Sequence, residues 1–347
     1  MMTKIMFTIL MFFSIHLGIA QNSFQEIFNK NTRPLKENIR LDVNDALGNQ
    51  GHLPISIIKG KTDGPVFTIV AGVHGFEYPP IIATQELMQE IKTEELSGAI
   101  IFIPIANTAS FFTRTPFINP QDKTNLNGAF PGDSTGTITQ RLAYIITDNI
   151  IPVSDVFLDI HGGDANEDLI PFVCYYDNEN RPQKTQLARE LSENSGFEYV
   201  VSYPYTITDD EPAKYAFKQA VQDGKTALSI ESGKLGNVQA EAVKLIKTGV
   251  YNMLATMNMY AMDKRAKPDI INLDRQAYLR SNEKGIFYSE FRAGDTVKKG
   301  ELVGYCTDEF GTVITEYEAP ASGIILYKLA TPPINVGDTI MCIGSSL

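Results

Sequence analysis

Apolar runs of strand length alternate with longer helix-like stretches from about residue 40 to residue 265, and this alternation restricts the fold more than any other feature of the chain. It is typical of a β-sheet covered by helices. The expected strands are Val66–Ala71, Ala99–Ile105, Val156–Ile160, Tyr199–Tyr203 and Thr226–Ile230. The expected helices are Pro79–Ile91, Thr139–Asp148, Lys184–Asn194, Pro212–Gln222 and Val238–Met259. The pattern therefore predicts a large α/β domain over residues 21–265.

The C-terminal part, residues 266–347, has a different character, with short β-rich runs separated by closely spaced glycines. Such spacing predicts hairpins rather than helices. The run Gly294–Gly300 and the turn Ala319–Gly323 resemble the lipoyl and biotinyl carrier barrels, which present a modified lysine on a hairpin shortly before the alanine-proline turn. No lysine lies between Lys299 and Lys328. We therefore expect a small all-β barrel or sandwich domain without the carrier function.

The first 20 residues have the pattern of a cleavable secretory signal. They carry one charge, at Lys4, followed by the apolar run Ile5–Phe13 and by small residues that end at Ala20. A membrane anchor is less favoured, because this run is shorter than the ~20 residues that span a bilayer. The mature chain is expected to begin near Gln21 and to be exported, either periplasmic or secreted, with no stable membrane anchor.

The composition allows a large core and argues against two classes of protein. Of the 347 residues, 43% are apolar and 20% are charged, so disorder is not indicated. The formal net charge of −11 argues against nucleic-acid binding. The cysteines Cys174, Cys306 and Cys342 make a poor disulfide framework, although a Cys306–Cys342 bridge stays open. The oligomeric state is also left open, and a homo-oligomer is compatible with the sequence.

Two histidines follow expected strands and stand beside glycine, where α/β enzymes place their sites. Glu77 lies three residues after His74, so both side chains can turn toward one point. His161 follows the strand Val156–Ile160 and can reach the same sheet edge. A lone histidine-glutamate pair is more often a helix cap beside a solvated carboxylate. Two imidazoles and a carboxylate, with a fourth position for water, are instead typical of catalytic zinc, and we predict one Zn²⁺ per chain.

A third strand end carries a candidate general base. Glu231 directly follows the apolar strand Thr226–Ile230. A glutamate in an apolar setting has a raised pKa, which suits a group that takes a proton from water and passes it to a leaving amine. Taken alone, Glu231 could equally be a surface residue. The assignment as general base therefore depends on its location at a strand end.

A polar loop lies between the two histidine segments. Arg114 is followed by Asn125–Gly132, whose amides and glycines suit a loop that covers a site. Arg114 is a candidate to stabilise a developing oxyanion electrostatically. Without the neighbouring motifs, this segment would indicate only a connection rich in turns.

The motifs form an ordered set over roughly residues 65 to 235: Gly72-x-His74-Gly75-x-Glu77, Arg114, Asn125-Leu126-Asn127-x-x-Phe130-Pro131-Gly132, Asp159-x-His161 and Glu231-x-Gly233. In this order they resemble the succinylglutamate desuccinylase/aspartoacylase family, within the zinc carboxypeptidase superfamily. The resemblance implies a mixed β-sheet flanked by helices and a C-terminal β domain. It also implies zinc on His74, Glu77 and His161, with Glu231 as general base, Arg114 polarising the substrate carbonyl, and Asn125 and Asn127 as substrate contacts.

The sequence departs from the family pattern at Gly128, where the family usually has arginine directly after the asparagine. The planar guanidinium holds a substrate carboxylate bidentately. Its loss costs on the order of 1.5–3 kcal/mol for a charge-assisted hydrogen bond. We therefore expect the chemistry to be kept while recognition shifts toward a neutral or differently placed acyl group. Arg141 and Lys234 are candidates to replace the lost cation.

Three functions follow from the sequence. The first is a zinc-dependent deacylase that cleaves an N-acyl amino acid or a related small amide. The second is an exported carboxypeptidase or murein-peptide amidase, which the secretory signal favours and the missing arginine disfavours. The third is a non-catalytic binding protein on the same fold. Retention of both histidines together with Glu77, Glu231 and Arg114 argues against the third.

Overall fold

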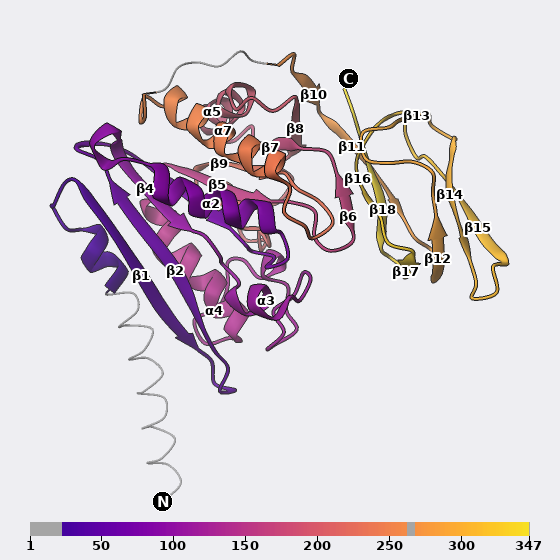
Figure 1. The fold of residues 1–347 in the computed structure, drawn as a ribbon, viewed down its shortest axis with the longest axis horizontal. Helices are drawn as coiled ribbons and strands as arrows, with labels where there is room; N and C mark the ends of the chain where they lie inside the picture. Colours follow the sequence, from indigo (N-terminus) through magenta and orange to yellow (C-terminus); the bar gives the residue numbers. More distant parts are fainter. Residues whose placement is uncertain (1–22, 262–267, 347) are drawn as a thin grey trace, which may run out of the picture.

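The computed structural model describes residues 23–261 and 268–346, and within them one large mixed sheet forms the centre of the molecule (Figure 1). Its strand order is β1-β2-β4-β3-β5-β9-β7-β8-β10. The expected secretory signal, residues 1–20, and the expected domain boundary at residue 265 lie outside the described residues. No helix in the described part is both long and apolar enough to cross a membrane.

The strands of this sheet are β1 (Leu35–Asn44), β2 (Gln50–Lys59), β3 (Thr62–Ala71), β4 (Ser97–Ile103), β5 (Val156–His161), β7 (Phe172–Asp177), β8 (Tyr199–Pro204), β9 (Thr226–Glu231) and β10 (Ile271–Leu273). The α-helices are α2 (Tyr78–Glu90), α3 (Thr108–Thr113), α4 (Ile138–Ile145), α5 (Pro182–Asn194), α6 (Ala216–Gln222) and α7 (Ala240–Thr256). Short helical turns occupy Thr93–Glu95, Leu126–Gly128, Ile146–Ile150 and Ile151–Val153.

Helices cover both faces of the sheet. Alternate residues of each strand point to opposite faces, so one strand serves two cores. Within β3, Phe67 and Ile69 belong to the core beneath α2, α5 and α7, whereas Val70 belongs to the core beneath α4 and α6. The central strands are buried on both sides, which is why they read as continuous apolar runs in the sequence. The expected mixed α/β fold is confirmed.

The expected elements differ from the observed ones mainly at their ends. The strand expected at Ala99–Ile105 ends at Ile103, directly before Pro104, which has no N–H to donate. The helix expected from Pro212 begins only at Ala216, because Lys214 has a positive φ of 72° and its backbone pairs with that of Phe130. The hairpin β1–β2 and the antiparallel strand β7 were not among the expected strands.

The C-terminal strands form two packed antiparallel sheets and no closed barrel. One sheet has the order β11-β18-β16-β13, with β6 joined to β16, and the other has the order β15-β14-β12-β17. Their facing side chains, including Phe287, Val303 and Ile343, form a separate core. Of the two expected forms, the sandwich is the observed one. Its strands are β6 (Glu167–Leu169), β11 (Arg275–Arg280), β12 (Gly285–Tyr288), β13 (Thr296–Val297), β14 (Leu302–Thr307), β15 (Val313–Glu318), β16 (Gly323–Leu329), β17 (Pro333–Ile334) and β18 (Thr339–Ser345).

Two connections tie the sandwich to the large sheet. Strand β6 leaves the large sheet after β5 and pairs antiparallel with β16, and β10 joins β8 at the edge of the large sheet. Figure 1 shows the two parts side by side with β6 between them. The three cysteines are buried and free, with Cys306 on β14 and Cys342 on β18, so the bridge left open by the sequence does not form.

Candidate active site

Three neighbouring parallel strands end at the same edge of the sheet, and the candidate catalytic and metal-binding side chains lie at or just after their ends. Strand β5 lies between β3 and β9, with Ala71 opposite Ile160 and His161 opposite Glu231. His74 follows β3, His161 ends β5, and Glu231 ends β9. The register therefore brings three groups that are far apart in sequence to one place.

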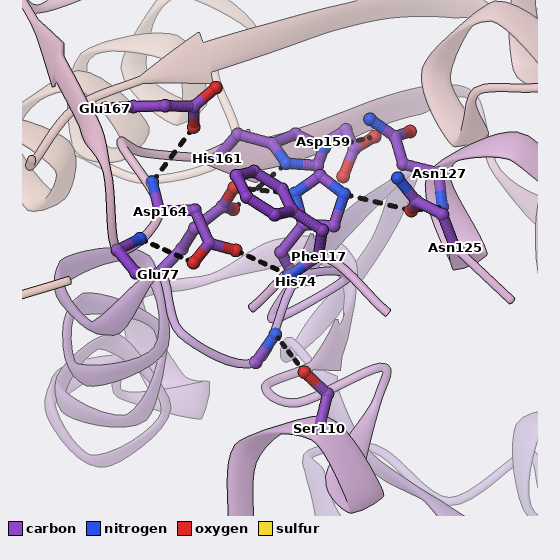
Figure 2. Close-up of polar contacts among 12 residues, drawn as sticks. His74, Glu77, Ser110, Phe117, Asn125, Asn127, Asp159, His161, Asp164 and Glu167 are labelled. Atoms are coloured by element: carbon purple, nitrogen blue, oxygen red, sulfur yellow. Dashed lines mark hydrogen bonds and ion pairs between the residues drawn. The ribbon is translucent and has the colours of Figure 1, made fainter. Parts of the chain in front are cut away.

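The turn between β3 and α2 determines how His74 and Glu77 lie. Glu77 is the N-cap residue of α2, yet its side chain makes no capping hydrogen bond. Pro79 and Pro80 stand in the first turn, where a backbone N–H has no partner within the helix. Gly75 packs against α3 and donates its N–H to Ser110 Oγ at 3.1 Å (Figure 2). The Glu77 carboxylate is thus available to contacts outside its helix.

Both imidazoles contact this carboxylate. His74 Nδ1 lies 2.7 Å from Glu77 Oε1, and His161 Nδ1 lies 3.1 Å from Glu77 Oε2. One ligand atom from each of the three residues falls within 4.8 Å of the other two. All three side chains are buried, with exposed fractions of 2–8%. The donor set, two imidazoles and one carboxylate converging on one point, fits a divalent transition metal such as zinc.

The far nitrogens of the two imidazoles have partners of their own. His74 Nε2 lies 3.1 Å from Asn125 Oδ1, and His161 Nε2 lies 3.2 Å from Asp159 Oδ2 (Figure 2). Each ring therefore lies between two oxygen atoms, that of Glu77 at Nδ1 and that of Asn125 or Asp159 at Nε2. If a metal took the place of the Nδ1 proton, the oxygen at Nε2 would keep the proton on that nitrogen and leave the Nδ1 lone pair free. Both rings therefore present the nitrogen that faces Glu77.

Two carboxyl groups of the site, those of Glu77 and Glu231, have pKa values shifted in opposite directions. Although burial opposes ionisation of Glu77, His74 and His161 hold the pKa of this carboxyl far below its usual range. Burial raises the pKa of Glu231 to about 8, and repulsion from Glu77 adds to the shift. The two carboxyl groups thus have different preferred protonation states, as expected for a ligand and a proton carrier.

A cavity of about 260 Å³ opens onto these groups. It is lined by His74, Glu77, Phe117, Asn127, His161, Gly162, Glu167, Leu169, Phe172, Tyr203, Glu231 and Tyr327. A second cavity of about 220 Å³, rich in tyrosine, shares Asn127, His161, Tyr203 and Glu231 with the first. A larger groove of about 510 Å³ lies between α2 and α7, remote from the histidines, and its Lys247 is paired with Glu86 and Glu90.

The loop residues expected at the site occupy three different positions. Asn127 lines the cavity, and its side-chain oxygen is buried without a protein partner in the described part of the chain. Asn125 is not in the lining; its Oδ1 caps the turn Leu126–Gly128 through Asn127 N and contacts His74. Arg114 ends α3 with a positive φ of 53°, is exposed, and is also outside the cavity lining.

Neither candidate for a replacement cation lies in the cavity. Lys234 Nζ pairs with Asp168 Oδ1 at 2.8 Å, and Arg141 Nε donates to the Gly136 carbonyl at 2.9 Å. Gly128 has open space where a Cβ would be built. Among the described residues that line the cavity there is no lysine or arginine.

Several residues at the site were not anticipated from the sequence. Glu167 on β6 and Tyr327 on β16 line the cavity, and both come from the part of the structure that joins the sandwich to the large sheet. Asp164 accepts from the Phe117 N–H at 2.9 Å and so holds that ring beside His74. The acidic residues that follow His161-Gly162-Gly163 are the one sequence signal that could have pointed to Glu167.

Comparisons with known proteins agree with this arrangement. The chain is 29% identical over 301 residues to the N-alpha-acetyl-L-2,4-diaminobutyric acid deacetylase of Halomonas elongata, covering 84% of this chain and 85% of that protein. A product-bound structure of the ectoine utilization protein EutE of Ruegeria pomeroyi aligns with a TM-score of 0.79 at 23% identity, covering 90% and 95% of the two chains. A succinylglutamate desuccinylase from Silicibacter sp. TM1040 aligns with a TM-score of 0.78 at 26% identity, covering 89% and 94%. The fold, the site and these relatives define an α/β amide hydrolase.

The family can be stated as well. The model of the succinylglutamate desuccinylase/aspartoacylase catalytic domain matches residues 63–257, a range that contains His74, Glu77, His161 and Glu231. The chain belongs to this family, as the motif order predicted.

Proposed function

We propose that this protein is a zinc-dependent deacylase that hydrolyses the amide bond of an N-acyl amino acid or a related small amide. The observation that carries the proposal is the convergence of His74, Glu77 and His161 within 4.8 Å at the edge of the sheet, with Glu231 on the adjacent strand. The Halomonas relative is named for the removal of an acetyl group from an amino acid, which supports the same class of substrate.

The residues fit a zinc ion. His74 and His161 would supply Nδ1 and Glu77 a carboxylate oxygen, and the contacts of both Nε2 atoms hold the rings in that orientation. When bound, zinc supplies Lewis acidity, which polarises a carbonyl and lowers the pKa of water to about 7. Three protein ligands leave a position for water or substrate, as in catalytic rather than structural zinc sites.

Glu231 is the residue we assign to proton transfer. It lines both cavities, and its register partner is His161, so it stands beside the proposed ligands without being one of them. A carboxyl group with a raised pKa takes a proton from the attacking water and gives it up to the leaving amine. Both steps use the same oxygen atoms of Glu231, so no second acid is needed.

The residues Arg114, Asn125 and Asn127, which lie between the two histidine segments, have different proposed roles toward the substrate. Asn127 has a buried side-chain oxygen aimed at no protein donor, which suits a hydrogen bond from a substrate N–H. Asn125 serves the site through His74 rather than through the substrate. Arg114 remains our candidate for the carbonyl, which requires its exposed side chain to turn toward the cavity when substrate binds.

The alternative within the same chemistry is an exported carboxypeptidase or murein-peptide amidase. The signal-like residues 1–20 support export, and the absence of lysine and arginine from the described cavity lining disfavours a free C-terminal carboxylate. A non-catalytic binding protein on the same fold is the remaining candidate. It gives no reason for Glu231 to be kept next to the histidines.

The test is a hydrolysis screen with purified mature protein loaded with zinc. N-acyl amino acids, small neutral amides and peptidoglycan fragments are compared, with Glu231→Gln as the matched variant. We expect turnover of N-acyl amino acids, a loss of about 10²- to 10⁴-fold in Glu231→Gln, and unchanged zinc content in that variant. Unchanged turnover in Glu231→Gln would contradict the mechanism, and turnover of peptidoglycan fragments alone would favour the amidase.

A further inference from the structure

Glu167 is an acidic residue in the cavity that the proposed mechanism does not use. It lies on β6, the short strand that pairs with β16, and the register places it opposite Leu329. Its backbone is held on both sides, because its N–H donates to the Asp164 carbonyl at 3.0 Å and its own carbonyl accepts from Leu235 N at 2.9 Å. The carboxylate is therefore presented to the cavity from a fixed piece of backbone.

The Glu167 side chain has one protein partner in the part of the chain that the structure describes. Its Oε2 accepts from the Asp164 N–H at 3.0 Å (Figure 2), and no described residue makes a hydrogen bond or ion pair with Oε1. The two lysines near this strand have other partners: Lys234 Nζ pairs with Asp168 Oδ1 at 2.8 Å, and Lys328, opposite Asp168 on β16, donates to the Phe291 carbonyl at 2.8 Å. Because successive strand residues point to opposite faces, Asp168 and its lysine face away from the cavity.

The cavity has more acidic groups than basic ones. Its lining contains three carboxyl groups, those of Glu77, Glu167 and Glu231, and, among the described residues, no lysine or arginine. When all three are ionised, a zinc ion offsets two of the negative charges and leaves one without a counter-charge. Burial and the neighbouring Glu77 raise the pKa of Glu167 to about 7, which reflects this missing counter-charge. A cation placed there would remove the cost of holding the ionised carboxylate.

Aromatic rings stand in the same wall. Tyr327 lies on β16 opposite Leu169, which is two residues after Glu167 on β6. Tyr203 lines both this cavity and the tyrosine-rich cavity beside it. Carboxylate and aromatic faces together are the surroundings that bind an ammonium group in proteins.

We propose that Glu167, with the rings of Tyr203 and Tyr327, forms a subsite for an ammonium group of the substrate, so that the enzyme selects N-acyl amino acids with a cationic side chain. This inference rests on the proposed deacylase function and adds the class of its substrate. The subsite lies where the C-terminal sandwich meets the large sheet.

Two isosteric substrate pairs test the subsite. Nα-acetylornithine is compared with Nα-acetylnorleucine, and Nα-acetyl-2,4-diaminobutyrate with Nα-acetylnorvaline, because each pair differs by an ammonium against a methyl group. Values of kcat/KM are measured for wild type, Glu167→Gln, Glu167→Asp and the exposed control Glu179→Gln. Binding of the free amino acids ornithine and norleucine is measured by calorimetry on zinc-loaded and zinc-free protein.

In wild type and Glu179→Gln we expect the cationic member of at least one pair to be preferred by about 10- to 100-fold, the size of a charge-assisted hydrogen bond. Glu167→Gln should bring that ratio near one, and Glu167→Asp should restore part of it. A wild-type ratio near one, or an unchanged ratio in Glu167→Gln, overturns the subsite. If no amide is hydrolysed, the deacylase proposal fails, and calorimetry still decides whether Glu167 selects ornithine over norleucine.

Discussion

At the scale of single residues, the site depends on side chains whose polar atoms contact residues far away in the sequence. Glu77 stands at an N-cap without capping its helix, and both of its oxygens face imidazoles. Asn125 does cap its turn, but the same Oδ1 also contacts His74. The proposed ligands could be predicted from sequence because the two histidines stand at the ends of apolar strands and Glu77 lies three residues after His74. The orienting role of Asn125 could not, because it depends on a contact across 51 positions.

A prediction for Glu231 concerns stability without metal. Its folded-state pKa of about 8 lies above the ordinary 4.5, so between these values the unfolded chain holds fewer protons than the folded one. Stability contributed by this carboxyl is therefore lost as pH rises from about 4.5 to 8. In zinc-free protein, Glu231→Gln should melt a few degrees higher than wild type at pH 8, with little difference at pH 4. Thermal unfolding at both pH values measures this; an equal shift at both would contradict the buried, protonated state.

A second prediction at this scale concerns Gly128. A Cβ built there meets no atom within 4 Å, so a side chain can leave the backbone at this position without a clash at its first atom. Gly128→Arg should improve kcat/KM for N-acyl amino acids with a free carboxylate by about tenfold or more, because it adds a charge-assisted contact. Gly128→Gln, of similar length and no charge, is the control. If Arg and Gln variants behave alike, the missing guanidinium does not set the substrate preference.

At the scale of elements, the connection from β3 to α2 positions two of the three proposed ligands, and α3 holds that connection in place. The strands β3, β5 and β9 were predictable because they are buried on both faces and read as apolar runs. The hairpin β1–β2 was missed because β1 is an edge strand with many exposed positions, so polar residues interrupt its apolar ones. The strand β6 has only three residues and no periodicity to detect.

Gly75 gives the prediction at this scale. A Cβ at this position would overlap the backbone of Phe111 in α3, so Gly75→Ala must push the two segments apart. We expect a loss of about 1–3 kcal/mol in stability and weaker zinc binding, because His74 and Glu77 flank the displaced residue. Gly128→Ala, in open space, is the matched control. Chemical denaturation and zinc titration of both variants check the result; wild-type affinity in Gly75→Ala would show that α3 does not position the ligands.

At the scale of the whole molecule, the sandwich takes part in the site. Its strand β16 supplies Tyr327 to the cavity and pairs with β6, which supplies Glu167 (Figure 1). The sequence predicted two parts, and the glycine spacing predicted the β-rich character of the second. It could not predict that the second part would close the cavity of the first, because the β6–β16 pairing joins residues more than 150 positions apart.

The measurement that tests the account most directly is the metal content of the purified protein, compared with that of the variants His161→Ala and Glu231→Gln. We predict about one zinc ion per chain in wild type and Glu231→Gln, and loss of zinc in His161→Ala. Removing zinc with a chelator should abolish amide hydrolysis in wild type, and adding zinc back should restore it. Hydrolysis that persists in fully zinc-free protein, or zinc retained in His161→Ala at the wild-type level, would contradict the proposed zinc site.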